Sequence, residues 1–307
     1  MVILSASAAS HGQDDRNPEQ MALGIYVFGN STVDSGNGWG ASLLGLPDAL
    51  PFQSLTDVLN ASTITGINYA VARTGILSEI GINYRNNTSY WDFDLQIELF
   101  NVTMTIYLCK FLNQQQMGDH LSKLIFFVSF GINDFNLNFL PPSKGTLCQL
   151  APQVFSELLL EALAQRLKML HKLAAGKMLI NNIWPLGCSP MFSNSFACYN
   201  GAVNQKVLPY SMGLPQLLNG LKSNLTGALF SFSDNFAFVA NLKQGPTFGK
   251  FKYSCMKLHK IYFFNLICCG AEVDHYLYVD SLHLNVAASR VFSFACFNGT
   301  MCSPNVL

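Results

Sequence analysis

The chain has 307 residues, of which 50% are hydrophobic and 12% are charged, and its 18 basic and 18 acidic residues give a formal net charge of zero at pH 7. This length and composition allow one large hydrophobic core, or two small ones. A neutral chain gives no electrostatic footprint for nucleic acid or for an anionic membrane surface, so we expect no nucleic-acid partner. No apolar run approaches the roughly 20 residues needed to span a bilayer, so we expect no transmembrane segment.

Strand-like and helix-like segments alternate along the chain. Short apolar runs predict strands at 23–28, 64–71, 123–130, 177–183 and 228–232. Helical spacing of apolar residues predicts helices over 154–173 (ended by Gly176), 201–221 and 286–297. Strands that alternate with crossover helices indicate an α/β fold of three layers, in which a doubly wound, mostly parallel sheet lies between helices.

The pattern predicts one domain with two short extensions. We assign residues 23–299 to a single domain, residues 1–22 to an N-terminal segment and residues 300–307 to a C-terminal tail. The N-terminal segment is apolar and then rich in small residues, which favours a remnant of a secretory signal peptide, although it has no basic start.

Nine cysteines and seven Asn-x-Ser/Thr sequons together favour a secreted, extracellular glycoprotein. The sequons lie at Asn30, Asn60, Asn86, Asn87, Asn101, Asn224 and Asn298. Cys188 and Cys198 bracket a polar loop and predict a small disulfide. No Cys-x-x-Cys pair or histidine cluster has the spacing of a zinc site, so we expect no metal, and no other cofactor is implied.

Three polar turns follow predicted strands. Ser31 follows the first strand, the segment 66–75 overlaps the end of the second, and Asn133 follows the third. Ligands of doubly wound sheets bind at the carboxyl ends of the strands, so we expect the three turns to form one site. His283 opens the last predicted helix and can return to the same edge.

Ser31 and the segment Asp280-Ser281-Leu282-His283 contain the groups of nucleophilic catalysis. A serine hydroxyl needs a base within hydrogen-bond reach, and that base needs an acid that orients it. Asp280 and His283 supply both from one turn. A structural interpretation stays open, in which Asp280 caps a helix that begins near Ser281.

Asn133 lies in the turn Gly131-Ile132-Asn133-Asp134 and carries a side-chain N–H donor. Such donors stabilise the oxyanion of a tetrahedral intermediate. The backbone N–H groups of Ser31 and of a residue near Ala72–Arg73 can add to it. Gly131 lets the chain turn sharply, and an ordinary turn is the alternative interpretation of this motif.

Taken together and in order, these motifs resemble the GDSL esterase/lipase family of the SGNH hydrolases, and its plant branch most closely. The matching segments are Ile25–Ser31, Gly66–Ala70, Phe130–Asp134, Trp184–Pro190 and Asp280–His283. The resemblance extends from about Leu23 to Gly299. It implies a flavodoxin-like SGNH hydrolase fold and hydrolysis of carboxylic esters of lipids or small alcohols through an acyl-enzyme.

The resemblance also implies roles for individual residues. The implied catalytic residues are Ser31, Asp280 and His283, the implied oxyanion donors are Asn133 and the backbone N–H groups of Ser31 and Arg73, and the implied supporting residues are Asn30, Asp34 and Gly131. The chain departs from the family at two of these positions. Asn30 stands where the family has an aspartate. Arg73 aligns with a glycine of the family, shortly after the second matching segment, Gly66–Ala70. The sequon at Asn30 overlaps the expected nucleophile, so we expect Asn30 to be buried and unmodified.

Two further functions stay open from the sequence. The first is a catalytically impaired, secreted glycoprotein that binds esters or glycans without turning them over. The second is an acyltransferase that uses the same triad with a sugar or alcohol as acceptor, because the triad itself does not separate transfer from hydrolysis.

Overall fold

The computed structural model of the chain describes residues 24–34, 48–55, 66–80, 92–141, 146–193, 200–241, 252–254, 276–297 and 301–304. The expected N-terminal segment 1–22 lies outside these ranges, as does half of the expected tail, so the domain boundaries stay predictions. No helix in the described part of the chain is long and apolar enough to cross a membrane.

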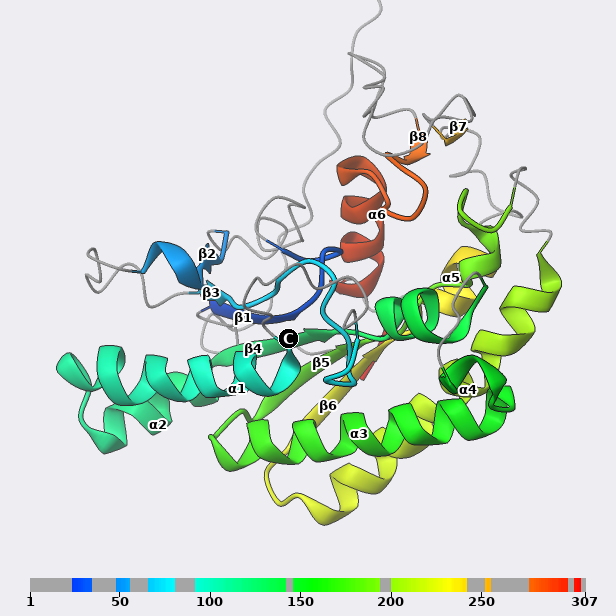
Figure 1. The fold of residues 1–307 in the computed structure, drawn as a ribbon. Coiled ribbons are helices and arrows are strands. Elements are labelled where there is room, and N and C mark those ends of the chain that lie inside the picture. Colours follow the sequence, from blue (N-terminus) through cyan, green and yellow to red (C-terminus); the bar gives the residue numbers. More distant parts are fainter. Residues whose placement is uncertain are drawn as a thin grey trace, which may run out of the picture.

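A seven-stranded sheet forms the middle layer of the described residues (Figure 1). Its strands are β1 (Gly24–Gly29), β2 (Leu50–Pro51), β3 (Gly66–Asn68), β4 (Leu124–Ser129), β5 (Lys177–Asn181), β6 (Leu229–Ser233) and β9 (Cys302–Ser303). The spatial order is β2-β3-β1-β4-β5-β6-β9, with β9 alone antiparallel to its neighbour. The strands β3-β1-β4-β5-β6 reproduce the flavodoxin-like order 2-1-3-4-5, which confirms the predicted fold class.

The two central strands explain why the sheet could be predicted. Every residue of β1 and of β4 is buried, and their register pairs Gly24 with Leu124 and Gly29 with Ser129. Strands covered on both faces read as continuous apolar runs, and this is the pattern of both segments. All five predicted strands are present. The short edge strands β2 and β9, and the separate parallel pair β7 (Lys252–Ser254) and β8 (Tyr276–Tyr278), were not predicted.

Helices cover both faces of the sheet: α1 and α3 lie on one face and α6 lies on the other (Figure 1). The helices are α1 (Phe93–Val102), α2 (Gln114–Ser122), α3 (Pro152–Lys172), α4 (Gly201–Asn224), α5 (Asn235–Asn241) and α6 (Val286–Phe297). Short 3₁₀ turns occupy Phe52–Ser54, Leu108–Lys110, Thr146–Gln149 and Leu186–Cys188, and π-helical turns occupy Thr103–Tyr107 and Asp134–Phe139. The predicted helices correspond to α3, α4 and α6.

The end of α3 differs from the prediction. The helix stops at Lys172, and Ala174 takes a left-handed conformation with φ of 67°. The N–H of Ala174 donates to the carbonyl of His171 at 2.9 Å, and that of Ala175 donates to Leu170 at 3.1 Å. This is a Schellman end with alanine in the position usually taken by glycine. Gly176, which the sequence predicted as the stop, lies beyond it.

An aromatic cluster packs β1 against α1 and fixes the strand that leads to Ser31. The ring of Phe28 stacks on Tyr69 at 5.0 Å between centroids and meets Phe100 of α1 edge-on at 5.8 Å. Tyr26 meets Phe100 and Phe126 edge-on at 5.7 and 5.8 Å. Each such pair contributes about 0.5–1.5 kcal/mol beyond the area it buries, so the position of β1 is strongly determined.

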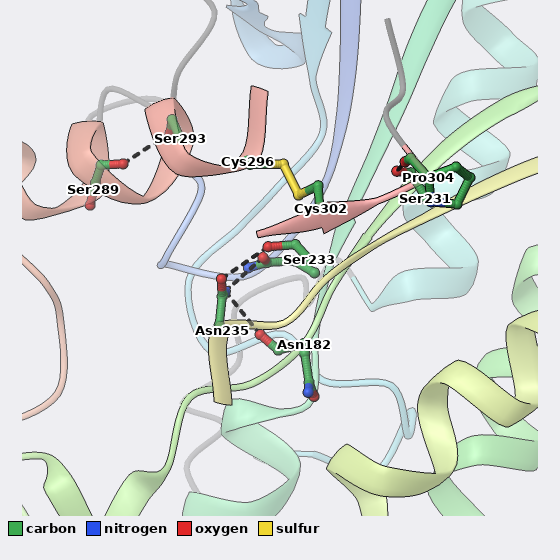
Figure 2. The surroundings of a disulfide bond; sticks show 10 residues. Asn182, Ser231, Ser233, Asn235, Ser289, Ser293, Cys296, Cys302 and Pro304 are labelled. Atoms are coloured by element: carbon green, nitrogen blue, oxygen red, sulfur yellow. Dashed lines mark hydrogen bonds between the residues drawn. A yellow bond between two sulfur atoms is a disulfide. The ribbon is translucent and has the colours of Figure 1, made fainter. Parts of the chain in front are cut away.

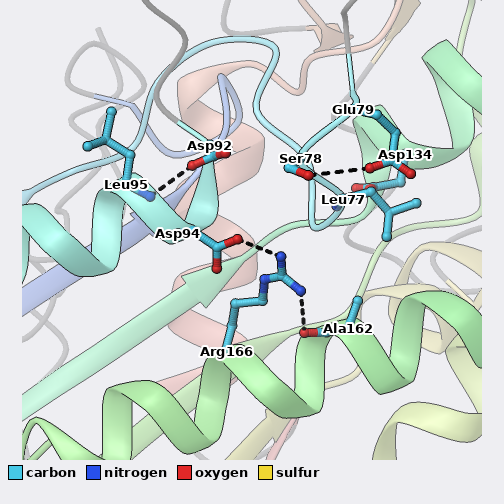
Figure 3. Close-up of polar contacts among 9 residues, drawn as sticks. All are labelled: Leu77, Ser78, Glu79, Asp92, Asp94, Leu95, Asp134, Ala162 and Arg166. Atoms are coloured by element: carbon cyan, nitrogen blue, oxygen red, sulfur yellow. Dashed lines mark hydrogen bonds and ion pairs between the residues drawn. The ribbon is translucent and has the colours of Figure 1, made fainter.

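Polar contacts tie α1 to its neighbours (Figure 3). Asp92 caps the helix by accepting the N–H of Leu95 at 2.8 Å. Arg166 of α3 donates to Asp94 at 2.6 Å and to the carbonyl of Ala162 at 3.2 Å. The Asp94 side chain is 39% exposed, so this ion pair contributes at most about 1 kcal/mol and serves mainly to orient the two helices.

A disulfide between Cys296 and Cys302 joins the last turn of α6 to β9 (Figure 2). It closes a short loop and holds the C-terminal strand at the edge of the sheet beside β6. Cys188 is also disulfide-bonded. Cys198 lies outside the described residues, so its predicted pairing with Cys188 stays a prediction.

Candidate active site

The turn that presents Ser31 is built on Gly29, the last residue of β1. A Cβ at this position would lie 2.4 Å from the Val33 side chain and 2.7 Å from the Ser129 carbonyl, so no other residue fits without displacing the backbone. Gln96 of α1 binds both backbone groups of Gly29: it accepts the N–H and donates to the carbonyl, each at 2.9 Å. Sequence analysis missed Gln96, although a lone amide on the apolar face of a helix was a usable signal.

Asn30 braces the same turn from inside the protein. It is 1% exposed, which confirms the expected burial of this sequon position. Its Oδ1 atom accepts the backbone N–H of Thr32 at 3.0 Å and the Thr32 hydroxyl at 2.7 Å. An aspartate carboxylate would accept the same two hydrogens. Asn30 therefore retains the hydrogen-bonding part of the residue that the family has here.

Three side chains from opposite ends of the chain meet at this turn. Ser31 Oγ lies 2.8 Å from His283 Nε2, across a separation of 252 residues. His283 Nδ1 lies 2.6 Å from Asp280 Oδ2. The imidazole therefore lies between a hydroxyl and a carboxylate, with one ring nitrogen directed to each. The three residues that the sequence predicted as a catalytic group lie within hydrogen-bond distance of one another.

Asp280 organises the turn that carries His283. Its second oxygen, Oδ1, accepts the backbone N–H of Leu282 at 2.7 Å and that of His283 at 2.6 Å. Helix α6 begins only at Val286, and Asn285 Oδ1 accepts the N–H of Ala288 at its first turn. The alternative interpretation of Asp280 as a cap of a helix beginning near Ser281 is therefore wrong.

The electrostatics of this turn favour a positively charged imidazole. Burial acts to lower the pKa of His283, but the hydrogen bond to Asp280 and the charges of Asp280 and Asp34 outweigh it, and the pKa is raised. Burial acts to raise the pKa of Asp280, but its bonds to His283 dominate and lower it. Burial raises the pKa of Asp34, against the opposing effect of His283. The protonated form of the imidazole is therefore stabilised in this environment.

Asn133 stands at the end of β4, 5% exposed, and contacts the loop that follows β3. Its Nδ2 atom donates to the carbonyl of Thr74 at 2.9 Å, which uses one of its two N–H groups. Gly131 holds φ of 109°, a conformation that strains any residue with a side chain. The N–H of Val71 donates to the carbonyl of Gly29 at 3.2 Å. The loop at 71–75 is thus held at both ends, by the turn of Ser31 and by Asn133.

Asp134 holds this loop from inside the core. It is fully buried, and its two carboxylate oxygens accept the backbone N–H groups of Ile76 at 2.9 Å and Leu77 at 3.0 Å. Figure 3 shows Asp134 beside Leu77. A Cβ on Gly75 would lie 2.8 Å from both oxygens. Burial raises the pKa of Asp134 to about 7, partly offset by the two backbone bonds. Sequence analysis assigned Asp134 no role beyond its place in the motif.

The buried carboxyl of Asp134 makes a prediction about stability. Its folded pKa of about 7 lies above the ordinary value of 3.8, so its contribution to stability is full below pH 3.8 and is lost as the pH rises through 7. We expect the free energy of unfolding to fall more steeply between pH 4 and pH 8 in the wild type than in Asp134→Asn. Urea unfolding at several pH values measures this, with Asp94→Asn, a partly exposed carboxylate, as control. An equal pH dependence of the free energy of unfolding in the wild type and in Asp134→Asn would contradict the raised pKa of Asp134.

A pocket opens beside His283, and part of its lining is a network of hydrogen-bonded polar side chains. Its lining residues are Thr32, Asn181, Trp184, Asn235, His283, Leu284, Ser289 and Phe292. Asn235 donates to Asn181 at 2.7 Å, and Asn181 donates to Ser129 at 3.0 Å; Figure 2 shows Asn235 next to Ser233 and Asn182. The described residues contain no group of three or more His, Cys, Asp or Glu side chains that could hold a metal ion.

Ser31, His283 and Asp280 are joined by two successive hydrogen-bond contacts at the carboxyl edge of a flavodoxin-like sheet. This arrangement is typical of a class of proteins, the ester hydrolases built on a doubly wound sheet. The chain belongs to the GDSL-like lipase/acylhydrolase family, whose model matches residues 25–293. Membership of this family supports hydrolase activity on ester bonds.

The relatives are plant proteins. The chain is 25% identical to GDSL esterase/lipase 7 of Arabidopsis thaliana, over 97% of this chain and 93% of that protein. It is 30% identical to another GDSL esterase/lipase of the same plant, over 85% of this chain and 74% of that protein. The predicted resemblance to the plant branch is thereby confirmed. Among solved structures, an acetyl xylan esterase aligns with 90% of this chain and 100% of its own, with 14% identity and a TM-score of 0.45.

Proposed function

We propose that this protein is a serine hydrolase of carboxylic esters of lipids or small alcohols and that it works through an acyl-enzyme. The observation that carries the proposal is the continuous contact from Ser31 Oγ through the imidazole of His283 to Asp280, at 2.8 and 2.6 Å. A nucleophile, a base and an orienting acid are the three parts that this chemistry needs.

In the first half of the reaction, Ser31 Oγ attacks the ester carbonyl while His283 Nε2 takes its proton. The resulting imidazolium is stabilised by Asp280, which stays ionised because its pKa is lowered. When the tetrahedral intermediate collapses, His283 returns the proton to the departing alkoxide, and the alcohol leaves. In the second half, water attacks the acyl-serine with His283 as base, and the carboxylic acid and free Ser31 are released.

The oxyanion of each intermediate needs donors in place beforehand. The second N–H of the Asn133 amide is not used by its bond to Thr74, and we assign it to the oxyanion. The backbone N–H groups of Ser31 and Arg73 complete the set. Asn30, Asp34 and Gly131 support the site: Asn30 braces the turn of Ser31, Asp34 favours the imidazolium, and Gly131 allows the turn that places Asn133.

The secreted, extracellular location remains part of the proposal. Asn101 and Asn224, two of the sequon residues, are exposed, as glycosylation requires. Mass analysis of the protein purified from a eukaryotic secretory host, before and after glycosidase treatment, tests this. No glycan at either position would contradict it.

Hydrolysis of 4-nitrophenyl butyrate by the wild type and by Ser31→Ala tests the function. We expect the wild type to release nitrophenol with a burst that marks acyl-enzyme formation, and Ser31→Ala to show only the background rate. Ser223→Ala, an exposed serine of α4, is the matched control and keeps the wild-type rate. Equal rates for the wild type and Ser31→Ala would favour an impaired ester-binding glycoprotein. Acyl transfer to an added alcohol in preference to water would indicate an acyltransferase.

Removal of the Asn133 amide tests the oxyanion assignment. We expect Asn133→Ala to lower kcat by about 100- to 1,000-fold with little change in KM, since the lost bond forms mainly in the transition state. The exposed Asn219→Ala on α4 is the control and keeps the wild-type kcat. A change confined to KM would contradict the role. Circular dichroism of both variants separates loss of function from loss of fold.

Asn30 makes a different prediction. Because its amide oxygen already accepts both hydrogens of Thr32, we expect Asn30→Asp to change kcat/KM by less than about threefold, a difference of roughly 0.7 kcal/mol. Asn30→Ala leaves the Thr32 N–H without its acceptor, at a cost of about 1–3 kcal/mol, and lowers both stability and kcat. Thermal unfolding and steady-state kinetics measure both. A tenfold or larger gain in Asn30→Asp would show that the missing charge matters.

A further inference from the structure

The Arg73 side chain is the feature of this site that the proposed reaction does not use. Its backbone has φ of 66°, in the left-handed region. A residue with a Cβ is strained there by about 1–2 kcal/mol, and glycine is not. Glycine is also what the resembled family has at this position. Strained residues of this kind cluster at functional sites and persist where the surrounding structure holds them.

The contacts of its neighbours place the backbone of Arg73 in the loop beside the turn of Ser31. Two residues before it, Val71 is bonded to Gly29, which leads into the turn of Ser31. One residue after it, Thr74 is bonded to Asn133 at 2.9 Å. Gly29 and Asn133 both lie at the carboxyl edge of the sheet. The backbone of Arg73 therefore lies between the turn of Ser31 and the proposed oxyanion donor. Arg73 is exposed, so its side chain is accessible to a ligand from solvent.

The guanidinium of Arg73 is available to a ligand. It makes no ion pair with any residue in the described ranges. Of the acidic groups near the site, Asp280 is bonded to His283 and Asp134 to two backbone N–H groups. Asp34 interacts with His283. The carboxylates that interact with His283 therefore have partners of their own, and Arg73 adds a positive charge to the loop that Asn133 contacts.

We propose that Arg73 determines substrate specificity by binding a carboxylate or phosphate group of the ester, so that the preferred substrates are anionic. The inference rests on the proposed ester hydrolysis and adds the substrate class. Arginine suits this role because its planar fork donates two parallel hydrogen bonds to a carboxylate or phosphate. The backbone N–H of Arg73 then serves the oxyanion while its side chain holds the anionic end of the same substrate, so one residue aligns both.

Two pairs of esters test the proposal, because the negative charge can lie on the acyl part or on the alcohol part. The acyl pair is 4-nitrophenyl pentanoate and the 4-nitrophenyl monoester of glutaric acid, which differ in a terminal methyl or carboxylate. The alcohol pair is 4-butyryloxybenzoate and its methyl ester. The readout is the ratio of kcat/KM for the anionic ester to that for its neutral partner, in the wild type, Arg73→Gln, Arg73→Gly and Arg73→Lys.

In at least one pair we expect the ratio of kcat/KM for the anionic ester to that for its neutral partner to fall about tenfold in Arg73→Gln and Arg73→Gly. Arg73→Lys keeps part of the preference because it keeps the charge. The wild-type preference decreases in 0.5 M NaCl, since the contact is exposed to solvent. Lys222→Gln, an equal loss of charge at the end of α4, leaves both ratios unchanged.

Two results overturn the proposal, and they are distinguishable. Ratios that are unchanged in Arg73→Gln and Arg73→Gly, in an enzyme that hydrolyses the neutral esters, remove the role of Arg73 and leave the ester hydrolase intact. Failure of the wild type to exceed Ser31→Ala on all four esters removes the proposed function, and the substrate preference falls with it.

Discussion

Replacing His283 with alanine will lower kcat for ester hydrolysis by about 10⁴- to 10⁶-fold, an effect comparable to the loss of Ser31 itself. The imidazole contacts both Ser31 Oγ and Asp280, so its loss leaves the serine without a base and removes the side-chain partner of Asp280 Oδ2. The residual rate comes from substrate binding and the oxyanion donors alone. Steady-state hydrolysis of 4-nitrophenyl butyrate measures the effect.

The matched control for this experiment is His171→Ala. His171 lies in the last turn of α3, where its ring contacts the carbonyl of Thr226 at 3.2 Å, far along the chain from the proposed catalytic groups. We expect its kcat to equal that of the wild type. A loss of less than tenfold in His283→Ala would mean that another group accepts the serine proton and would contradict the proposed mechanism.

Replacing Asp280 with asparagine will lower kcat by about 10⁴-fold and change its dependence on pH. Asparagine keeps an oxygen for the N–H groups of Leu282 and His283, so the turn survives, but the charge that stabilises the imidazolium is lost. Activity requires neutral His283, and in the wild type it is lost as the pH falls through the raised pKa of that residue. We expect this acid limb to move to lower pH in Asp280→Asn.

The profile of kcat/KM between pH 4 and pH 9, for the wild type and Asp280→Asn, measures both effects. Asp94→Asn, in the partly buried pair with Arg166, is the control and leaves the profile unchanged. An acid limb at the same pH in the wild type and in Asp280→Asn would show that Asp280 does not set the pKa of His283. An acid limb that moves to higher pH in Asp280→Asn would contradict the conclusion that Asp280 stabilises the imidazolium of His283.

The central part of the fold could be predicted because its signal is local. The residues of β1 and β4 are buried on both faces, so they read as continuous apolar runs in any context. The edge strands β2 and β9 have two residues each, and they exist only because a neighbouring strand supplies the hydrogen bonds. Such strands carry no pattern of their own, and the sequence did not reveal them.

The positions of the candidate site residues were predictable to the extent that they depend on strand ends. Ser31 and Asn133 directly follow β1 and β4, the two strands on either side of the point where the strand order reverses. Ligands bind at this point in doubly wound sheets. Their approach to the turn of Asp280 and His283 depends on where α6 packs, which the sequence indicates only through the resemblance to a family.

The supporting contacts were not predictable, because they join segments far apart in the chain. Gln96 binds Gly29 across 67 residues, and Asp134 binds Ile76 across 58. The left-handed backbone of Arg73 is likewise set by the loop on either side of it, since arginine has no preference for that conformation. These residues decide how rigidly the proposed oxyanion donors are held, and only the folded structure identifies them.

The proposal that His283 activates Ser31 is tested most directly by covalent labelling. A fluorophosphonate probe reacts with an activated serine hydroxyl, and mass spectrometry of the digested protein locates the modified residue. We expect one label per chain, on Ser31, at a rate that falls to the background in a folded His283→Ala variant and is unchanged in His171→Ala. Labelling elsewhere, or equal labelling of Ser31 in the wild type and in folded His283→Ala, would contradict the account.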